Sequence, residues 1–279
     1  MELLDGKKIK LEKIKELKDV IDNLERKPGL AVIQVGDNPA SNVYVGNKEK
    51  TGLELGCNFE HIKFPNDVEE DLILATIDKL NDDMSIDGIL VQMPLPEHLN
   101  ASKIQNRICH KKDVDGLTDI NAGLLIHNKE CLIPCTPNGI IEMLKYYNIS
   151  ISGKNVVIVG RSELVGRPML SLMLNNNATV TICHSYTSNL GDITNKADIL
   201  VVAVGKKHII DSSMVKEGAV VIDVGINRED GKLYGDVNFE DVKDKCSYIT
   251  PVPGGVGQMT VLSLYQNLLK AYKMNNLDM

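Results

Sequence analysis

Aromatic residues are scarce in this chain, which has no tryptophan and only three phenylalanines among its 279 residues. Single-stranded nucleic acids stack their bases on aromatic side chains, so this scarcity argues against them as ligands. The formal net charge of -7 and the lack of a basic run argue against nucleic-acid binding in general. With 43% hydrophobic and 25% charged residues, the chain is instead typical of globular proteins and is long enough for two domains.

Long apolar segments and paired cysteines are also missing. No segment approaches the roughly 20 apolar residues of a membrane helix, and residues 1–8 lack the apolar core of a signal peptide. The six cysteines form no C-x-x-C pair and have no histidine partners at zinc-finger spacing. We therefore expect a cytosolic protein with reduced cysteines, no membrane partner and no metal site, and a small-molecule enzyme is the simplest class.

The most informative segment is 154–168, in which a buried strand runs into a tight turn and a helix. Nucleotide phosphates bind at such turns in α/β folds. The glycines, Gly160 and Gly166, depart from the usual G-x-G-x-x-G spacing because Ser162 has the second position, so the segment alone also fits an ordinary βα turn. Repeated βαβ units are nevertheless predicted, because apolar runs separated by helix-length segments follow at 178–183, 199–204 and 219–224.

The residues after the strand at 178–183 indicate which nicotinamide cofactor is bound. An NAD enzyme would carry an acidic residue there to bind the ribose hydroxyls. This chain has His184 and Ser185 instead, and Arg161 lies in the preceding turn. A guanidinium group suits a 2′-phosphate, so the pattern predicts NADP rather than NAD.

The first half of the chain also alternates between helical and strand patterns, although it has no phosphate-binding turn of its own. Predicted helices cover 7–27, 38–56 and 68–80, and predicted strands cover 30–35, 58–64 and 86–92. Residues 111–136 are predicted to be loop, and further helices are predicted at 137–148 and 256–274. The fold class is therefore α/β with two α/β domains, the second a Rossmann-like doubly wound parallel sheet.

Tyr44 and Lys48 are four residues apart on the helix predicted at 38–56, so both project from one face. The spacing matches the Tyr-x-x-x-Lys dyad of short-chain dehydrogenases, but in those enzymes the dyad follows the dinucleotide turn. Here it precedes that turn by more than about a hundred residues, which argues against that class. A solvated helix face is the plain structural alternative for both residues.

Two further polar residues are candidates for a ligand site. Gln92 closes the strand at 86–92, and open α/β sheets bind ligands at the carboxyl ends of their strands. Its amide could equally satisfy the backbone of its own loop. Asp115 lies in an acidic turn that could anchor a substrate or could simply be solvated.

Six sequence blocks, in order, carry a resemblance to a known family; they are 38–48, 87–96, 112–117, 134–139, 160–168 and 251–260. Together they resemble the bifunctional methylenetetrahydrofolate dehydrogenase/methenyltetrahydrofolate cyclohydrolases. The resemblance covers essentially the whole chain. One departure is Gln258, where the family often has proline.

The resemblance implies two α/β domains flanking a folate cleft. The first, 1–135, would bind folate and carry the catalytic residues, with the helix at 258–279 packing back onto it. The second, 136–257, would bind NADP. The substrates would be tetrahydrofolate derivatives, and the enzyme would be a homodimer.

The resemblance also implies site residues. Tyr44, Lys48, Gln92 and Asp115 match the family's active-site positions, with Tyr44 near the reacting ring and Asp115 hydrogen-bonded to the pterin. Lys48 would be the base of the cyclohydrolase, because a desolvated lysine beside a cationic substrate can give up its proton and activate water. Gln92 would position Lys48 or that water.

Two further groups of positions match the family's ligand contacts. Those expected along the folate are Pro253, Gly254 and Gly255. Those expected at the cofactor are Gly160, Arg161, Ser162, Val165, Gly166, His184, Ser185, Ile226 and Thr260.

Two other classes of protein stay open on the sequence. An NADP-dependent reductase of an unrelated carbonyl substrate would keep the second domain but leave Gln92 and Asp115 without roles. A non-catalytic nucleotide-binding protein would keep the fold without turnover.

Overall fold

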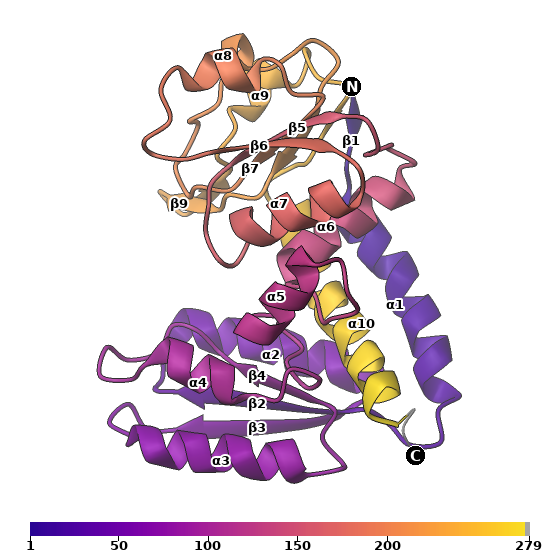
Figure 1. Ribbon diagram of the computed structural model, residues 1–279, viewed down its shortest axis with the longest axis vertical. Helices are drawn as coiled ribbons and strands as arrows, with labels where there is room; N and C mark the ends of the chain where they lie inside the picture. Colours follow the sequence, from indigo (N-terminus) through magenta and orange to yellow (C-terminus); the bar gives the residue numbers. More distant parts are fainter. Residues whose placement is uncertain (277–279) are drawn as a thin grey trace. The chain divides into compact units, whose positions relative to one another are not determined.

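The computed structural model describes residues 1–276, and the chain divides into two units (Figure 1). The six-stranded unit comprises residues 1–11 and 136–260. The three-stranded unit comprises residues 12–135 and the chain from 261 onward. Each contains a parallel sheet with helices on both faces, so the predicted two-domain α/β fold is confirmed.

The sheet of the six-stranded unit is entirely parallel, with strand order β1-β11-β8-β7-β5-β6. Parallel strands covered by helices on both faces must be apolar on both sides, which explains uninterrupted runs such as Ile199–Val202. The strands are β1 (Glu2–Leu3), β5 (Asn155–Val159), β6 (Thr179–Cys183), β7 (Ile199–Val202), β8 (Val220–Asp223) and β11 (Tyr248–Ile249).

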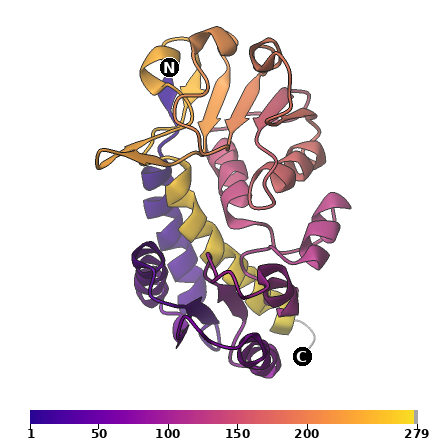
Figure 2. The ribbon, with the colours of Figure 1, turned by 90° about the vertical axis from the view of Figure 1, so that its left-hand side faces the viewer.

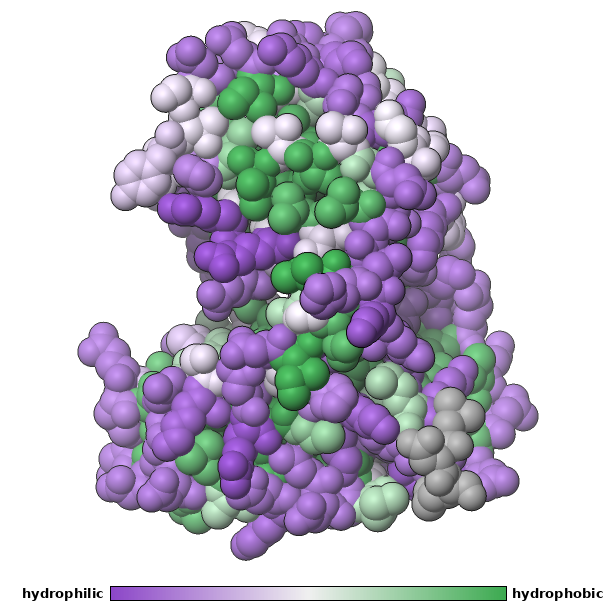
Figure 3. Space-filling view, in the orientation of Figure 1, coloured by the Kyte–Doolittle hydropathy of each residue, from purple (hydrophilic) through white to green (hydrophobic). Residues whose placement is uncertain are grey.

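Helices lie on both faces of this sheet (Figure 1). On one face are α6 (Cys135–Tyr146) and α7 (Gly166–Asn175), and on the other are α8 (Leu190–Thr194) and α9 (Phe239–Val242). Leu200 and Val202 of β7 pack in one apolar cluster with Ile193 of α8 and Val242 of α9. Hydrophobic residues also gather on the surface over β6 and α7 (Figure 3), where Leu174 is 60% exposed.

A short antiparallel hairpin, β9 (Asn227–Glu229) and β10 (Lys232–Tyr234), projects from the six-stranded unit (Figure 2). Its turn is Asp230-Gly231, and both residues have positive φ, 49° and 75°. Asp-Gly is the preferred dipeptide for such a two-residue turn, because glycine adopts this backbone conformation without steric cost. Local turn chemistry therefore defines the hairpin.

The three-stranded unit has the strand order β3-β2-β4, from β3 (Asn58–Phe64), β2 (Gly29–Val35) and β4 (Gly88–Val91). One face of this sheet packs against α3 (Glu70–Asp82) and α4 (Ala101–Arg107) through an apolar cluster that includes Ile33, Ile77, Ile89 and Ile104. The remaining helices are α1 (Gly6–Asp22), α2 (Pro39–Glu54), α5 (Asp119–Ile126) and α10 (Val256–Asn276). The helix η1 (Ser212–Met214) belongs to the six-stranded unit.

The structure corrects two sequence predictions. Residues 111–136 are not all loop, because they contain α5, which Thr118 caps by accepting a hydrogen bond from the backbone N–H of Asn121. Residues 1–11 do not lie with the rest of 1–135 but with the six-stranded unit. The reason is backbone pairing: β1 pairs with β11, and the N–H of Lys7 donates to the carbonyl of Gly254.

The last helix crosses from one unit to the other. Residues 256–260 of α10 lie in the six-stranded unit, and the helix continues from 261 in the three-stranded unit. Of the predicted C-terminal helix, 258–279, the last three residues lie outside the described part. Among residues 1–276, no helix is long and apolar enough to cross a membrane.

Gly88 of β4 allows α10 to approach the sheet, and this generates a stability prediction. A Cβ atom at Gly88 would lie 2.5 Å from Val114 Cγ1 and 2.8 Å from Leu268 Cδ1. We expect Gly88→Ala to lower the free energy of unfolding by about 1 to 3 kcal/mol through overpacking. The control is Gly123→Ala in α5, where nothing lies within 4 Å, and we expect a gain of about 0.5 to 1 kcal/mol. Urea unfolding measures both, and equal effects would contradict the packing argument.

Candidate active site

Lys48 and Gln92 form a direct hydrogen bond in the three-stranded unit. The side chain of Asn38 caps α2 by accepting from the N–H groups of Ala40 and Ser41, at 2.9 and 3.2 Å, which fixes where the helix starts. Lys48, three turns into α2, donates from Nζ to Gln92 Oε1 at 2.8 Å. The two residues are 44 positions apart, so the fold and not local sequence brings them together.

Gln92 follows β4, at the carboxyl end of the strand. Its Nε2 donates to the carbonyl of Met93 at 2.7 Å, which turns the Oε1 atom toward Lys48. The amide therefore hydrogen-bonds both to the backbone of its own loop and to Lys48. A structural role in the loop and a role in a ligand site, the two alternatives for Gln92, are thus compatible. Tyr44 lies one helical turn before Lys48 on α2 and is 57% exposed, so its ring is available to a ligand.

Asp115 lies in a turn that a neighbouring carboxylate holds in place. Asp113 is fully buried and accepts hydrogen bonds from Gln105 Nε2, the Thr118 N–H and Asn121 Nδ2, at 3.2, 2.8 and 2.9 Å. Gly116 follows with φ of 68°. Asp113 is thus structural, whereas Asp115, in the same turn, is half-buried and is the candidate for binding a ligand.

The carboxyl group of Asp115 is enclosed, and this changes its acidity. Burial raises its pKa, whereas the positive charge of Lys48 acts in the opposite direction. Cys135, which was not predicted as a site residue, donates from its thiol to Asp115 Oδ1 at 3.6 Å. Burial also raises the pKa of Cys135 well above its usual value, which keeps the thiol a neutral donor. Only its place in the block at 134–139 could have suggested this role.

The turn after β5 in the six-stranded unit is closed by two glycines. A Cβ atom at Gly160, whose φ is 124°, would lie 2.2 Å from the carbonyl oxygen of Ala203. One at Gly166 would lie 2.1 Å from the carbonyl oxygen of Gly160. The Ser162 hydroxyl accepts from the N–H of Val165 at 3.2 Å, beside the start of α7. Only glycine allows the strand, turn and helix to approach this closely.

Polar and aromatic side chains surround this turn. Arg161 is exposed, and its guanidinium carbon lies 5.8 Å from the ring centroid of Tyr186. His184, directly after β6, contacts the same ring at 6.1 Å between centroids, and its Nδ1 accepts from the Tyr186 N–H at 3.2 Å. Ser185 is exposed between them. Tyr186 was not predicted, although it is an aromatic residue directly after the candidate cofactor residues.

The remaining predicted residues lie near the start of α10. Thr260 Oγ1 is 3.1 Å from Thr136 Oγ1, and the exposed Ile226 side chain lies near Gly257. Pro253 is exposed, and the adjacent Gly254 and Gly255 pack against the start of α1, where a Cβ on Gly6 would lie 2.1 Å from Gly255 O. At Gln258, the N–H donates to the Gly255 carbonyl at 3.1 Å, a bond that proline could not make.

Comparison with known proteins decides the family. Two family models match: tetrahydrofolate dehydrogenase/cyclohydrolase, catalytic domain, over residues 4–115, and its NAD(P)-binding domain over residues 134–276. The bifunctional protein FolD of Bacillus subtilis is 50% identical over 275 residues, which cover 97% of each chain. The chain belongs to the tetrahydrofolate dehydrogenase/cyclohydrolase family.

Solved structures of the family agree. The bifunctional enzyme FolD of Campylobacter jejuni superposes with a TM-score of 0.96 and 46% identity, covering 98% of this chain and 99% of that one. The methylenetetrahydrofolate dehydrogenase-cyclohydrolase of Trypanosoma brucei, complexed with NADP and an inhibitor, has a TM-score of 0.91 and 34% identity, covering 97% and 96%. The predicted family, its two enzyme activities and its NADP cofactor are therefore confirmed.

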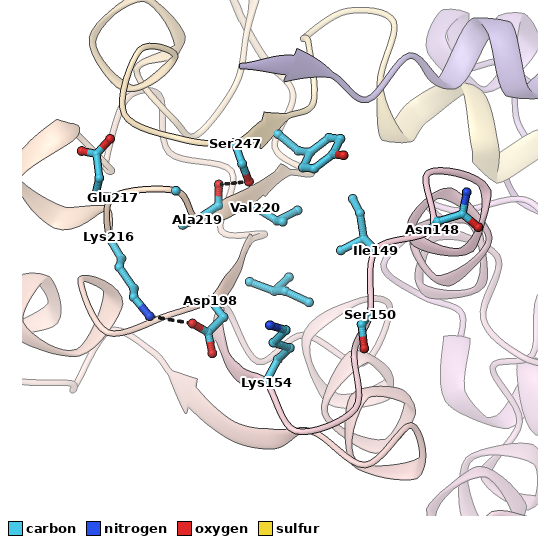
Figure 4. A pocket seen from close by; sticks show the side chains of 13 residues that line it. Asn148, Ile149, Ser150, Lys154, Asp198, Lys216, Glu217, Ala219, Val220 and Ser247 are labelled. Carbon is cyan, nitrogen blue, oxygen red and sulfur yellow. Dashed lines mark hydrogen bonds and ion pairs between the residues drawn. The ribbon is translucent and has the colours of Figure 1, made fainter.

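The glycine turn leads directly into the N-terminus of α7, where backbone N–H groups favour an anion such as a phosphate. Neither Gly160 nor Gly166 leaves room for a side chain, because a Cβ atom at either would meet a backbone carbonyl oxygen. The exposed Arg161 supplies positive charge beside this turn. A separate hollow, lined by Lys154, Asp198, Lys216 and Ser247 (Figure 4), lies at the amino ends of the strands, opposite to this turn.

Two buried carboxylates, Asp223 and Asp236, organise the loops at the carboxyl ends of β7 and β8. Asp236 accepts from the N–H groups of Val204, Gly205 and Lys206 at 2.7 to 3.0 Å. Asp223, at the end of β8, accepts from the N–H groups of Gly225, Asp236 and Val237. Neither was predicted from the sequence, although Asp223 ends an apolar strand, which is a recognisable signal. These carboxylates fix the loop that carries Ile226.

Asp223 makes the stability of this unit depend on pH. Burial raises its pKa from 3.8 to about 7, although three backbone N–H groups oppose the shift. Between pH 4 and 7 the folded state keeps a proton that the unfolded state loses. The contribution of Asp223 to the free energy of unfolding therefore falls as pH rises, by at most about 1.4 kcal/mol per pH unit, and the loss is complete above pH 7.

We therefore expect wild type to lose roughly 2 kcal/mol relative to Asp223→Asn between pH 5 and pH 8. Urea unfolding of both proteins at the two pH values measures this difference. Taking the difference between the two proteins cancels the titration of all other groups. If the difference in free energy of unfolding between the two proteins stays constant with pH, the pKa of Asp223 is not raised in the folded protein.

Proposed function

We propose that the three-stranded unit binds a tetrahydrofolate substrate and that the six-stranded unit binds NADP. The enzyme oxidises 5,10-methylenetetrahydrofolate to 5,10-methenyltetrahydrofolate and hydrolyses that cation to 10-formyltetrahydrofolate. The observation that carries the assignment of the hydrolytic site is the hydrogen bond from Lys48 Nζ to Gln92 Oε1, at 2.8 Å, beside the half-buried Asp115, whose pKa burial raises and the positive charge of Lys48 lowers.

Lys48 acts as the base of the hydrolysis. Water adds to the cationic one-carbon unit, and the proton that it loses passes to the Lys48 amine as the C–O bond forms. The ring then opens as the bond from carbon to N5 breaks. N5 takes up a proton, which Lys48 can return, and the remaining hydroxyl proton leaves to solvent as the formyl C=O forms. One proton is released overall, which balances the charge of the substrate.

Gln92 and Asp115 hold the reacting groups. Gln92 Oε1 accepts from Lys48, so the amine nitrogen keeps a fixed position and directs its lone pair at the water. Asp115 anchors the pterin, because a carboxyl group can accept from ring N–H groups and, when protonated, can also donate. Tyr44 stacks its exposed ring on the substrate, and Pro253, Gly254 and Gly255 line the folate.

The dehydrogenase step requires positioning rather than acid–base chemistry. When bound, NADP would supply the acceptor for the hydride of the methylene carbon. The turn at Gly160, Ser162, Val165 and Gly166 would orient the cofactor, and Ile226 and Thr260 would lie beside the nicotinamide. Arg161, His184 and Ser185 bind the 2′-phosphate, since a guanidinium group forms strong charge-assisted hydrogen bonds with phosphate oxygens.

Lys48→Met tests the hydrolytic site. We expect it to abolish cyclohydrolase activity, because among residues 1–276 Lys48 is the side-chain base that is hydrogen-bonded to Gln92, while NADP binding stays near that of wild type. The assay supplies 5,10-methylenetetrahydrofolate with NADP and follows the reduced cofactor and the methenyl product by absorbance. Methenyl should accumulate only in the variant. The matched control is Lys50→Met, an exposed lysine on the same helix. Normal hydrolysis by Lys48→Met would remove Lys48 from the mechanism.

Arg161→Ala tests how the cofactor is chosen. We expect it to weaken binding of NADP more than of NAD by about 1 to 3 kcal/mol, the scale of a lost charge-assisted hydrogen bond. Dissociation constants for both cofactors, from fluorescence titration, give the difference. Arg107→Ala, an exposed arginine of the three-stranded unit that pairs with Asp78, serves as control. Equal losses of binding free energy for NADP and NAD would mean that Arg161 does not bind the 2′-phosphate.

The homodimer and the cytosolic location stay predictions. The outer strand β6, with the hydrophobic surface over it and α7 (Figure 3), is a sheet edge at which a second copy could pair. The carbonyl reductase and the non-catalytic nucleotide-binding protein are set aside, because the chain belongs to the tetrahydrofolate dehydrogenase/cyclohydrolase family.

A further inference from the structure

Two polar side chains of α10, Tyr265 and Asn267, are almost completely buried in the three-stranded unit, at 0% and 4% exposure. A buried polar group is costly unless it forms hydrogen bonds, so the partners of these side chains indicate what they do. Both residues bond to the backbone of the segments that carry the candidate catalytic residues.

The Tyr265 hydroxyl donates a short hydrogen bond to the main-chain carbonyl of Lys48. Space for the phenol comes from Gly52 of α2, where a Cβ atom would lie 2.5 Å from the Tyr265 oxygen. Burial raises the pKa of Tyr265, so the hydroxyl stays protonated and remains a donor. The contact therefore fixes the backbone position of Lys48 against α10.

Asn267 joins the two segments on either side of the Asp115 carboxyl. Its Nδ2 donates to the carbonyls of Val114 at 2.8 Å and Ile133 at 2.7 Å, which uses both of its hydrogens. Val114 directly precedes Asp115, and Ile133 lies two residues before Cys135, the thiol that donates to Asp115. One amide thus sets the spacing between Asp115 and its thiol partner.

We propose that Tyr265 and Asn267 are positioning residues, Tyr265 for Lys48 in the hydrolysis and Asn267 for Asp115 in substrate binding. The proposal rests on the roles assigned to Lys48 and Asp115 above. Neither residue touches the reacting atoms, so each acts through the residue that it holds. Because their targets differ, the two side chains affect different kinetic constants.

Tyr265→Phe keeps the ring and removes only the hydroxyl. We expect kcat of the cyclohydrolase to fall roughly tenfold, the effect of one lost hydrogen bond on a precisely placed base. The KM for folate and kcat of the dehydrogenase should change less than about twofold, since hydride transfer does not use the base. Tyr272→Phe is the matched control, because this tyrosine lies on the same helix but packs against Arg26, with its ring 4.9 Å from the guanidinium carbon.

Asn267→Ala removes both donors. We expect the KM for the folate substrate to rise roughly tenfold in both reactions, because Asp115 anchors the substrate in each. The matched control is Asn275→Ala, further along α10, whose amide donates to the carbonyl of Lys111 at 3.5 Å. If Asn267→Ala does not fold, Asn267→Ser, which keeps a small polar side chain, is measured instead. Thermal melting of every variant checks that all assays use folded protein.

The outcomes separate this inference from the proposed function. Equal losses of both activities in Tyr265→Phe, or an unchanged KM for folate in the folded Asn267 variant, would overturn the inference. Lys48→Met and Asp115→Asn are assayed in parallel. If Lys48→Met hydrolyses normally, or Asp115→Asn binds folate normally, the proposed role itself has failed. If both lose function while the α10 variants behave as wild type, only the inference fails.

Discussion

Both sheets consist of parallel strands covered by helices on both faces, and this constraint determines where chemistry is possible. The central strands of such sheets are largely apolar, as the fully buried β2 and β7 are. Polar groups that have to meet a ligand are thereby confined to the turns where the strands end. Gln92 after β4 and, in the other sheet, Arg161 after β5 and His184 after β6 follow this rule, because the parallel strands of each sheet end at one edge.

The same constraint explains how much of the fold could be predicted from the sequence. Long apolar runs bounded by turn residues identified most strands, and β3 was predicted with its observed bounds, Asn58–Phe64. Elements whose existence depends on distant partners were missed. The two-residue β1 has no pattern of its own and is a strand only because β11 lies beside it. The helix α5 contains Asp, Asn and Gly, which obscure the helical spacing of its apolar residues, so the segment was predicted to be loop.

For the candidate site, the sequence could identify residues but not their partners. Lys48, Gln92 and Asp115 were found from strand ends, helix spacing and the family resemblance. The bond of Cys135 to Asp115, that of Tyr265 to the Lys48 carbonyl and that of Asn267 to Val114, next to Asp115, were not, since 20 to 217 residues separate the partners along the chain. The role of Asp236 was missed for the same reason. It accepts hydrogen bonds from the backbone N–H groups of a distant loop, and a sequence pattern does not show which backbone groups surround a side chain.

The continuity of α10 has a consequence for how this protein can change over evolutionary time. Thr260, expected beside the nicotinamide, and Tyr265, bonded to Lys48, lie five residues apart on one helix, a rise of about 7.5 Å. An insertion of one residue between them would rotate Tyr265 and Asn267 by about 100° about the helix axis relative to Thr260. The two units are therefore not exchangeable modules. A recombination that replaced one unit at the natural boundary near residue 135 would also have to supply a matching end of the chain.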